Sequence, residues 1–423
     1  MAESYDLVVR DAYEFERAEL VDIAIADGEI RRVADTVPEP GTEEIDADGN
    51  LVSPGLIDAH VHLDQALTAE GGRVPRHNDE PFDKDRCIGL SAEYFAEASK
   101  EEITQTALEV AGMFAANGTL SLRTHAYVDS EVGTKVVEAI LAAKDRLDGV
   151  VDLQVVVFPQ RGYVGDPGTE AAAREALELG ADVVGGIDPA SINTDIERSI
   201  ETWFDLATSY DVDIDAHIHD GGTLGMYTLS RLADETIEHD YQGRVTASHA
   251  FALADTASEK QDPRAGMTTV AGALDRFKQA ELEFVTCYPS IRPGHPVAQF
   301  HDEGLTMAHG SDEVRDMWVA HGNADVLEGA LVSSFKLSTD YAYATNPGLE
   351  TLWKLLTTEG ASVLDIDGYG IEEGTPADLV VWDQPSPQWA ILKQGARTHV
   401  VKDGAVVATD GELLPGVAAD LTD

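Results

Sequence analysis

The chain has 423 residues, 43% of them hydrophobic, which is enough for one large domain and a smaller one with buried cores. It has 78 acidic residues against 29 basic ones, so its net charge is −49, and such a surface repels the phosphates of nucleic acids. It has no apolar run of about 18 residues that could cross a membrane and no basic-then-apolar leader. We therefore expect a cytoplasmic protein without nucleic-acid or membrane partners.

The distribution of charge and the number of cysteines indicate the environment in which the protein works. The acidic residues are spread along the whole chain. A uniformly acidic surface repels itself unless concentrated salt screens the repulsion, so we hypothesise a halophilic source. The two cysteines, Cys87 and Cys287, are too few for a disulfide framework or a cysteine-based zinc site, and we expect free thiols.

Both ends of the chain have the pattern of short strands. Residues 6–52 contain three apolar runs separated by Asp-Gly turns, and residues 371–408 repeat this signature. Because chain termini tend to lie close together, the two segments are expected to meet in one small domain. We predict a β-sandwich domain formed by residues 1–52 and 370–423.

Between these ends, eight apolar runs alternate with stretches of helical periodicity. The runs lie in GLIDAHVHL, TLSLRTHA, VDLQVVVFPQ, ADVVGGID, DVDIDAHIH, RVTASHA, LEFVTCYPS and LTMAHGSD. Near-continuous apolar runs are typical of strands buried on both faces of a parallel sheet. Eight such units predict an α/β fold, a (β/α)8 TIM-type barrel over residues 53–369. The rival, an open doubly wound nucleotide-binding sheet, would need a glycine-rich phosphate turn, and the sequence has none.

Polar residues follow four of the predicted strands where the apolar pattern stops. They lie in His60-Val61-His62, His217-Ile218-His219-Asp220, Ser248-His249 and Ser311-Asp312-Glu313. In a barrel these strand ends converge on one mouth, where active sites lie. Alternate residues of a strand point to the same side, so the two imidazoles of an H-x-H pair can reach one ion. A further imidazole and a carboxylate would complete the shell and leave room for water, so the pattern predicts a metal site.

Several segments resemble the amidohydrolase superfamily, and within it the cytosine deaminase branch. They include PGLIDAHVHLD, RTHAYVDS, DVDIDAHIHDGGTLG and GSDEVRDMWVAHGN, and the likeness covers nearly the whole chain. The resemblance implies one divalent ion, Zn²⁺ or Fe²⁺, with His249 close to the water on it. The implied metal ligands are His60, His62, His217 and Asp312. Dinuclear relatives bridge two ions with a carboxylated lysine, and the third and fourth predicted strands end without one.

The resemblance also implies a reaction, the hydrolytic removal of an exocyclic amino or alkylamino group from a pyrimidine- or triazine-like ring, such as cytosine or an N-substituted aminotriazine. Asp312 would take a proton from the attacking water, and His249 would stabilise the adduct. The leaving amine must gain a proton, and His219 has the position and chemistry of that shuttle. The expected substrate contacts are Gln160, Glu313, Trp318, Gln65 and Asp220.

Two departures from the resembling enzymes leave the substrate open. Cytosine deaminases carry a glutamate where this chain has Asp220, and their triazine-degrading relatives carry a lysine where it has Gln65. Either His219 or Asp220 is therefore a candidate proton shuttle. A cyclic-amide hydrolase and a non-catalytic, metal-stabilised binding protein stay as alternatives. The expected partners are a small nitrogen heterocycle and water, with homo-oligomerisation left open.

The remaining histidines and two acids are expected in minor roles. His125 ends the second predicted strand and is a candidate for lining the pocket, and His309 is expected behind the site. Asp58 and Asp64 flank the first histidine pair, where they are candidates for orienting its imidazoles. The histidines expected on surfaces or in loops are His77, His239, His295, His301, His321 and His399.

Overall fold

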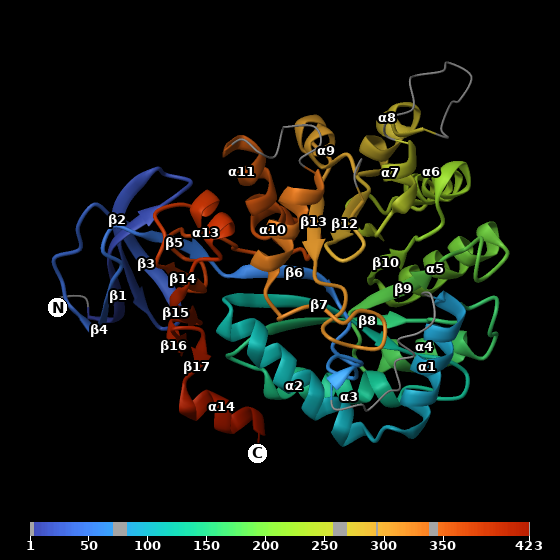
Figure 1. Cartoon of the computed structure of the whole chain (residues 1–423), viewed down its shortest axis with the longest axis horizontal. Coiled ribbons are helices and arrows are strands. Elements are labelled where there is room, and N and C mark those ends of the chain that lie inside the picture. The colour runs from blue at the N-terminus through green and yellow to red at the C-terminus, as the bar shows by residue number, and fades with distance from the viewer. Residues whose placement is uncertain (1–3, 71–82, 257–268, 293–294, 338–345, 423) are drawn as a thin grey trace.

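The computed structural model contains a barrel of eight parallel strands and a separate β-sheet (Figure 1). It describes residues 4–70, 83–256, 269–292, 295–337 and 346–422. The barrel strands are β6 (Leu56–Val61), β7 (Thr119–Tyr127), β8 (Asp152–Phe158), β9 (Val183–Ile187), β10 (Asp213–His217), β11 (Val245–Ser248), β12 (Glu283–Cys287) and β13 (Met307–Gly310). Each pairs in parallel with its neighbours in the chain, so the predicted barrel is confirmed.

The first and last barrel strands meet and close the barrel. Val61 of β6 forms a parallel bridge with Asp312, just after β13. The His62 N–H donates to the Asp312 carbonyl, and the Asp312 N–H donates to the His60 carbonyl, each at 2.8 Å. Closure therefore places the H-x-H pair beside an acid that lies about 250 residues further along the chain.

Helices connect the barrel strands or follow the last of them. They are α1 (Lys84–Glu97), α2 (Lys100–Ala116), α3 (Lys135–Arg146), α4 (Thr169–Glu178), α5 (Ile196–Tyr210), α6 (Gly222–Glu238), α7 (Phe251–Thr256), α8 (Val270–Ala280), α9 (Val297–Glu303), α10 (Val326–Leu337), α11 (Asn346–Leu355) and α12 (Thr358–Val363). Helix α2 begins at a capping box between Ser99 and Glu102, which satisfies two backbone N–H groups. Helix α1 was not predicted, because only Ser91, Ala92 and Phe95 are buried and they form too narrow an apolar stripe.

The two ends of the chain form the second sheet, as predicted. Its strands are β1 (Tyr5–Glu14), β2 (Glu19–Ala26), β3 (Glu29–Ala34), β4 (Gly41–Asp46), β5 (Leu51–Pro54), β14 (Leu379–Trp382), β15 (Arg397–Lys402), β16 (Ala405–Thr409) and β17 (Glu412–Leu413). Strand β5 pairs antiparallel with β14 and so joins the two ends. Strand β3 is also linked to the segment that precedes β14, because Ile30 exchanges backbone hydrogen bonds of 2.9 and 2.8 Å with Thr375 and Gly374.

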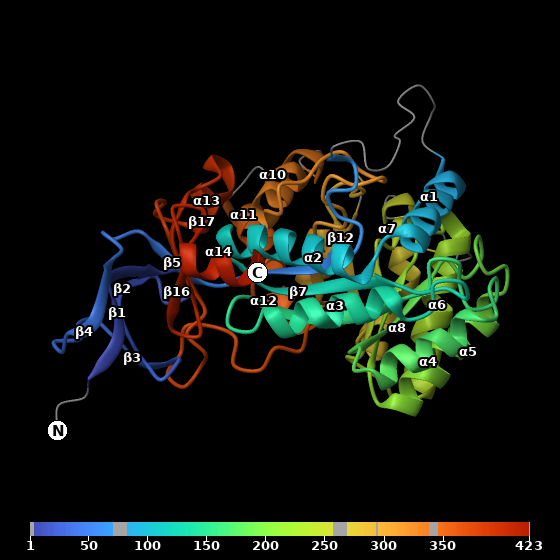
Figure 2. The same cartoon turned by 90° about the horizontal axis from the view of Figure 1, so that it is seen from below.

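The second sheet has its own apolar core and is tied to the barrel by two short helices. Its core residues come from strands of both chain ends. Helix α13 (Pro387–Lys393) packs against α10 and α11, and α14 (Pro415–Thr422) lies along α2 (Figures 1 and 2). Strand β5 crosses the predicted limit between residues 52 and 53, and the domain limits stay a prediction.

Burial explains why the barrel strands are mainly apolar. Every residue of β6, β7 and β9 is buried, as expected for strands covered by helices outside and by side chains inside. Among the helices of the described residues, none is both long and apolar enough to span a membrane.

Candidate active site

Three strand ends bring four predicted metal ligands to one point at the barrel mouth. His62 Nε2 lies 3.2 Å from His217 Nε2. Asp312 Oδ1 lies 3.5 Å from His60 Nε2 and 3.8 Å from His62 Nε2. Two ligand atoms bound to one ion at about 2.0–2.2 Å would lie roughly 3–3.5 Å apart, so these spacings are close to those of a shared ion.

The ring nitrogens at this point have the protonation and the unmet bonding capacity that a metal site requires. His60 Nε2 and His249 Nε2 are buried without a hydrogen-bond partner, which is costly unless another group satisfies them. Burial and the neighbouring His60 lower the pKa of His62 to about 3, and burial also lowers the pKa of His217. Neutral imidazoles are the form that binds a metal, so the donor set fits a divalent ion.

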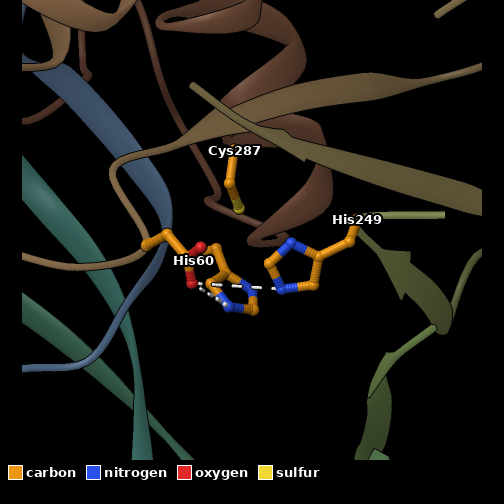
Figure 3. Close-up of side chains that lie close together, drawn as sticks. His60, His249 and Cys287 are labelled. Carbon is orange, nitrogen blue, oxygen red and sulfur yellow. Dashed lines mark ion pairs between the residues drawn. The ribbon is translucent and has the colours of Figure 1, made fainter. Parts of the chain in front are cut away.

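Cys287 also points toward this centre, which the sequence analysis did not anticipate. Its side chain lies beside His60 and His249 (Figure 3). The potential ligand atoms of these three residues and of Asp312 all lie within 4.8 Å of one another. Burial, with nearby carboxylates, raises the pKa of the Cys287 thiol well above its usual value. Because a thiol must ionise to bind a metal well, Cys287 is a poorer donor than the imidazoles.

A buried relay fixes the orientation of the His60 ring. Ser248 Oγ lies 3.0 Å from His60 Nδ1 and donates its proton to Asp215 Oδ1 at 2.6 Å. The serine can therefore only accept from His60, which places the ring proton on Nδ1 and leaves the Nε2 lone pair free for the centre. Arg123 donates to Asp215 Oδ2 at 3.2 Å and neutralises that buried carboxylate. One signal for this relay in the sequence was the arginine inside the apolar run TLSLRTHA.

His219 is held by Asp188, a residue that the sequence analysis did not select. Asp188, just after β9, is fully buried. Its Oδ1 accepts from the His219 N–H at 2.6 Å, and its Oδ2 lies 3.2 Å from His219 Nδ1. Burial lowers the pKa of His219, but the charge and hydrogen bond of Asp188 raise it more, so its net pKa is raised. The pair can hold a proton at the cavity wall near neutral pH.

A cavity of about 280 Å³ lies beside the ligand cluster. Most of the predicted site residues line it: His62, Gln160, His217, His219, His249, Asp312, Glu313 and Trp318. The remaining wall is largely apolar and includes Phe158, Ile187 and Phe251. A small, mostly apolar cavity with a few directed polar groups is typical of a site for a small ring compound.

Two predicted substrate contacts, Gln65 and Asp220, are not among the residues that line this cavity. The Gln65 amide donates to both Glu313 oxygens at 3.0 and 3.1 Å and accepts from Ser91. Asp220 Oδ2 accepts from the Ala190 N–H at 3.1 Å. The polar atoms of both side chains are hydrogen-bonded to other groups of the protein. Their direct contact with a substrate is therefore not supported.

Glu313 and Trp318 are fixed by the same network that holds Gln65. The Trp318 indole N–H donates to Ser91 Oγ at 3.1 Å, which orients one aromatic wall of the cavity. Burial, with the neighbouring Asp316 charge, raises the pKa of Glu313 well above its usual value. A carboxyl group that keeps its proton can donate a hydrogen bond as well as accept one.

Two further residues take part in the site in ways that differ from the expectations. His125 is fully buried and lies behind the ligands, with its ring centre 3.9 Å from that of His60, and it does not line the cavity. His295, expected on the surface, is buried and donates from Nε2 to the His249 carbonyl at 3.1 Å. The backbone of His249 is in the left-handed region, with φ 65°, and this bond helps hold it there.

The two acids beside the first histidine pair do not touch its imidazoles. Asp58 accepts from the backbone N–H groups of His60 and Ser311, and Asp64 accepts from that of Tyr127. These hydrogen bonds of the two acids go to backbone N–H groups, which favours a structural role for them at the strand ends. His309 is buried, as expected, and pairs with Ser333. His239, His301, His321 and His399 are exposed or half-buried, and His77 lies outside the described residues.

Comparison with known proteins agrees with this geometry. Residues 89–408 match the amidohydrolase family. The chain is 43% identical over 411 residues to N-isopropylammelide isopropyl amidohydrolase of Pseudomonas sp. (strain ADP), covering 97% of this chain and 99% of that protein.

Solved structures agree as well. N-isopropylammelide isopropylaminohydrolase from Burkholderia multivorans ATCC 17616 is 29% identical, with a TM-score of 0.84 over 96% of this chain and 99% of that one. The 5-methylcytosine deaminase from Klebsiella pneumoniae, liganded with phosphonocytosine, is 25% identical, with a TM-score of 0.83 over 95% of this chain and 98% of that one. Proteins of this superfamily typically use a divalent metal, and the histidine and aspartate cluster of this chain is able to bind one. The chain belongs to the amidohydrolase family and is a hydrolase that acts on C–N bonds.

Proposed function

We propose that the protein is a metal-dependent hydrolytic deaminase that removes an exocyclic amino or alkylamino group from a pyrimidine- or triazine-like ring. Cytosine and N-substituted aminotriazines are the proposed types of substrate. The observation that carries the proposal is the meeting of the imidazole and carboxylate cluster with the Asp188–His219 pair at one small cavity. The similarity to enzymes named for isopropylammelide and 5-methylcytosine supports the same ring class.

We assign one divalent ion, Zn²⁺ or Fe²⁺, to His60, His62, His217 and Asp312. When bound, such an ion acts as a Lewis acid and brings the pKa of water toward about 7. The ends of β8 and β9 carry Phe158-Pro159-Gln160 and Ile187-Asp188, without a lysine to bridge a second ion. Imidazole and carboxylate donors suit Zn²⁺ and Fe²⁺ alike.

The protein side chains supply the proton transfers that this hydrolysis needs. Water loses a proton when it adds to the ring carbon, and Asp312 is the carboxylate of the ligand cluster that could take it. The leaving amine must gain a proton. His219 lines the cavity and is held as an acid by Asp188, so we assign it that transfer. His249 Nε2 lies 3.9 Å from Asp312 Oδ1, and we assign His249 a hydrogen bond to the adduct.

The cavity wall suits a flat heterocycle. Trp318 and Phe158 offer aromatic faces for packing against a ring. Gln160 carries both a donor and an acceptor, which match the amide edge of a pyrimidine or triazine, and Glu313 is available to a ring N–H. These contacts would orient the ring with its exocyclic C–N bond at the ligand cluster.

A substrate panel tests the proposed reaction. Metal-loaded protein in molar salt is offered cytosine, isocytosine, creatinine, ammelide and N-alkylated aminotriazines, and ammonia and alkylamine are measured separately. The proposal expects amine release from at least one ring. Release from none of them contradicts it, and ring opening of a dihydropyrimidine or hydantoin in the same assay would instead indicate a cyclic-amide hydrolase.

Replacing His219 with Asn tests the assigned proton shuttle. Loss of a general acid should lower kcat roughly 10²–10⁴-fold. The metal content should stay at the wild-type value, because His219 is not among the assigned ligands. A near-wild-type rate in the His219→Asn variant would remove this residue from the mechanism.

A further inference from the structure

Lys84, the first residue of α1, lies at the wall of the same cavity. Its Nζ is 3.1 Å from Asp188 Oδ2 and 3.3 Å from Ser191 Oγ. Its side chain is 35% exposed. The ammonium group is therefore held by these two contacts and is still accessible to solvent. Among the described residues that line the cavity, Lys84 is the only lysine or arginine.

The contact with Asp188 does not use the whole bonding capacity of Lys84. An ammonium group has three N–H donors, and the structure gives Nζ two acceptors, Asp188 and Ser191. Asp188 itself already accepts two hydrogen bonds from His219. Lys84 therefore retains one donor for a molecule in the cavity, and its position is fixed before that molecule arrives.

The charges around the cavity indicate which kind of substrate the Lys84 ammonium group could favour. Asp312 lines the cavity, and the whole chain has a net charge of −49. The acidic surface repels an approaching anionic ring, and a fixed positive charge at the cavity wall, in addition to that of the proposed ion, would offset this repulsion. Lys84 provides that charge on the wall that also carries His219, since both side chains contact the same oxygen of Asp188.

We propose that Lys84 is a specificity-determining residue that favours rings carrying negative charge, by donating an N–H to an anionic oxygen of the ring. This inference rests on the proposed function, because it names the charge class of the substrate at the same cavity. Lys84 then distinguishes an oxygen-rich, acidic heterocycle from a neutral ring of the same size. Charge-assisted hydrogen bonds are the strong ones, so a single fixed ammonium group can carry such a preference.

Binding of two matched rings tests this proposal without any turnover. Barbiturate is an anion at pH 7.5 and uracil is a neutral ring of the same size. Their dissociation constants are measured by calorimetry on the metal-loaded protein, at the lowest salt concentration at which it stays folded. Wild-type protein should bind barbiturate more tightly, and Lys84→Met should weaken barbiturate binding about tenfold or more while changing uracil binding by less than about twofold.

Three controls separate the possible outcomes. Lys84→Arg should keep the preference, and Lys100→Met, which removes an exposed lysine paired with Glu138, should not alter it. If Lys84→Met does not fold, Lys84→Gln carries the same comparison. Equal binding of the two rings by wild-type protein, or an unchanged preference in Lys84→Met, overturns the inference. Failure of the proposed function is seen separately, as absence of amine release while the binding preference remains.

Discussion

Asp188 holds His219 at two points, through the backbone N–H at 2.6 Å and through the ring Nδ1 at 3.2 Å. The two residues lie at the ends of neighbouring barrel strands, β9 and β10, 31 positions apart in the sequence. Asp188 has a left-handed backbone, with φ 28°, which is strained for a residue other than glycine. The two contacts with Asp188 orient the His219 imidazole and favour its protonated form.

An Asp188→Asn variant should lose activity at high pH. The carboxylate raises the pKa of His219, so its removal should lower that pKa. An acid is present below its pKa and lost as the pH rises through it. The descending limb of the kcat profile should therefore move to lower pH, with kcat near neutrality reduced roughly 10–100-fold. The exposed Asp205→Asn is the control, and an unmoved limb would show that Asp188 does not tune His219.

Replacing Ser248 with Ala should weaken metal binding. The hydroxyl links the His60 ring to Asp215, and groups that orient a ligand ring typically contribute about 10–100-fold in metal affinity. Competition with a chelator measures this affinity. Ser333→Ala is a matched control, because it removes a buried hydroxyl from another histidine, His309. Equal chelator sensitivity of the two variants would contradict the relay.

Glu283, at the start of β12, should make the stability of the protein depend on pH. Burial raises its pKa from 4.5 to about 8. A raised pKa in the folded state contributes stability at low pH that is lost as the pH rises through the folded value. Glu283→Gln should therefore match wild type near pH 4.5 and exceed it above pH 8, by on the order of a few kcal/mol in the free energy of unfolding. Denaturant titrations at several pH values measure the difference.

The control for this comparison is Glu201→Gln on the exposed face of α5. It should follow the wild-type curve at every pH. A constant offset between wild type and Glu283→Gln across the whole range would show that Glu283 does not titrate as its burial requires.

The net charge of −49 should make folding depend on salt. At about 0.1 M salt the Debye length is roughly 10 Å, and at 1 M it is about 3 Å, so repulsion between surface carboxylates falls steeply over this range. We expect the Tm to rise with KCl from 0.1 to 3 M. Glycerol or sucrose that gives the same Tm increase in 0.1 M KCl would argue against charge screening and against the proposed halophilic source.

Much of the fold could be predicted because strands that are buried on both faces appear in the sequence as near-continuous apolar runs. All eight barrel strands coincide with apolar runs, and the strand patterns at both ends predicted that the two ends meet, as they do where β5 pairs with β14. Helices α1 and α14 were missed for a physical reason. Few of their residues are buried, and α14 buries only Leu421, so neither has the apolar stripe that marks a helix.

The meeting of the ligand cluster could be predicted because all four residues lie at strand ends, and a barrel brings such ends together. Their partners could not be predicted, since they depend on distances across the barrel: Ser248 contacts His60 from 188 residues away. Gln65 and Asp220 are the reverse case. The resemblance to other enzymes placed them among the expected substrate contacts, yet their polar atoms bond to Glu313 and Ala190.

The central claim is that side chains from distant parts of the chain hold one catalytic ion. An anomalous difference map from crystals of the metal-loaded protein, recorded at the zinc and iron absorption edges, tests it most directly. We predict one peak per chain, about 2.0–2.2 Å from a ring nitrogen of His60, His62 and His217 and from an oxygen of Asp312. Two peaks at the barrel mouth, or a single peak away from these four residues, would contradict the account.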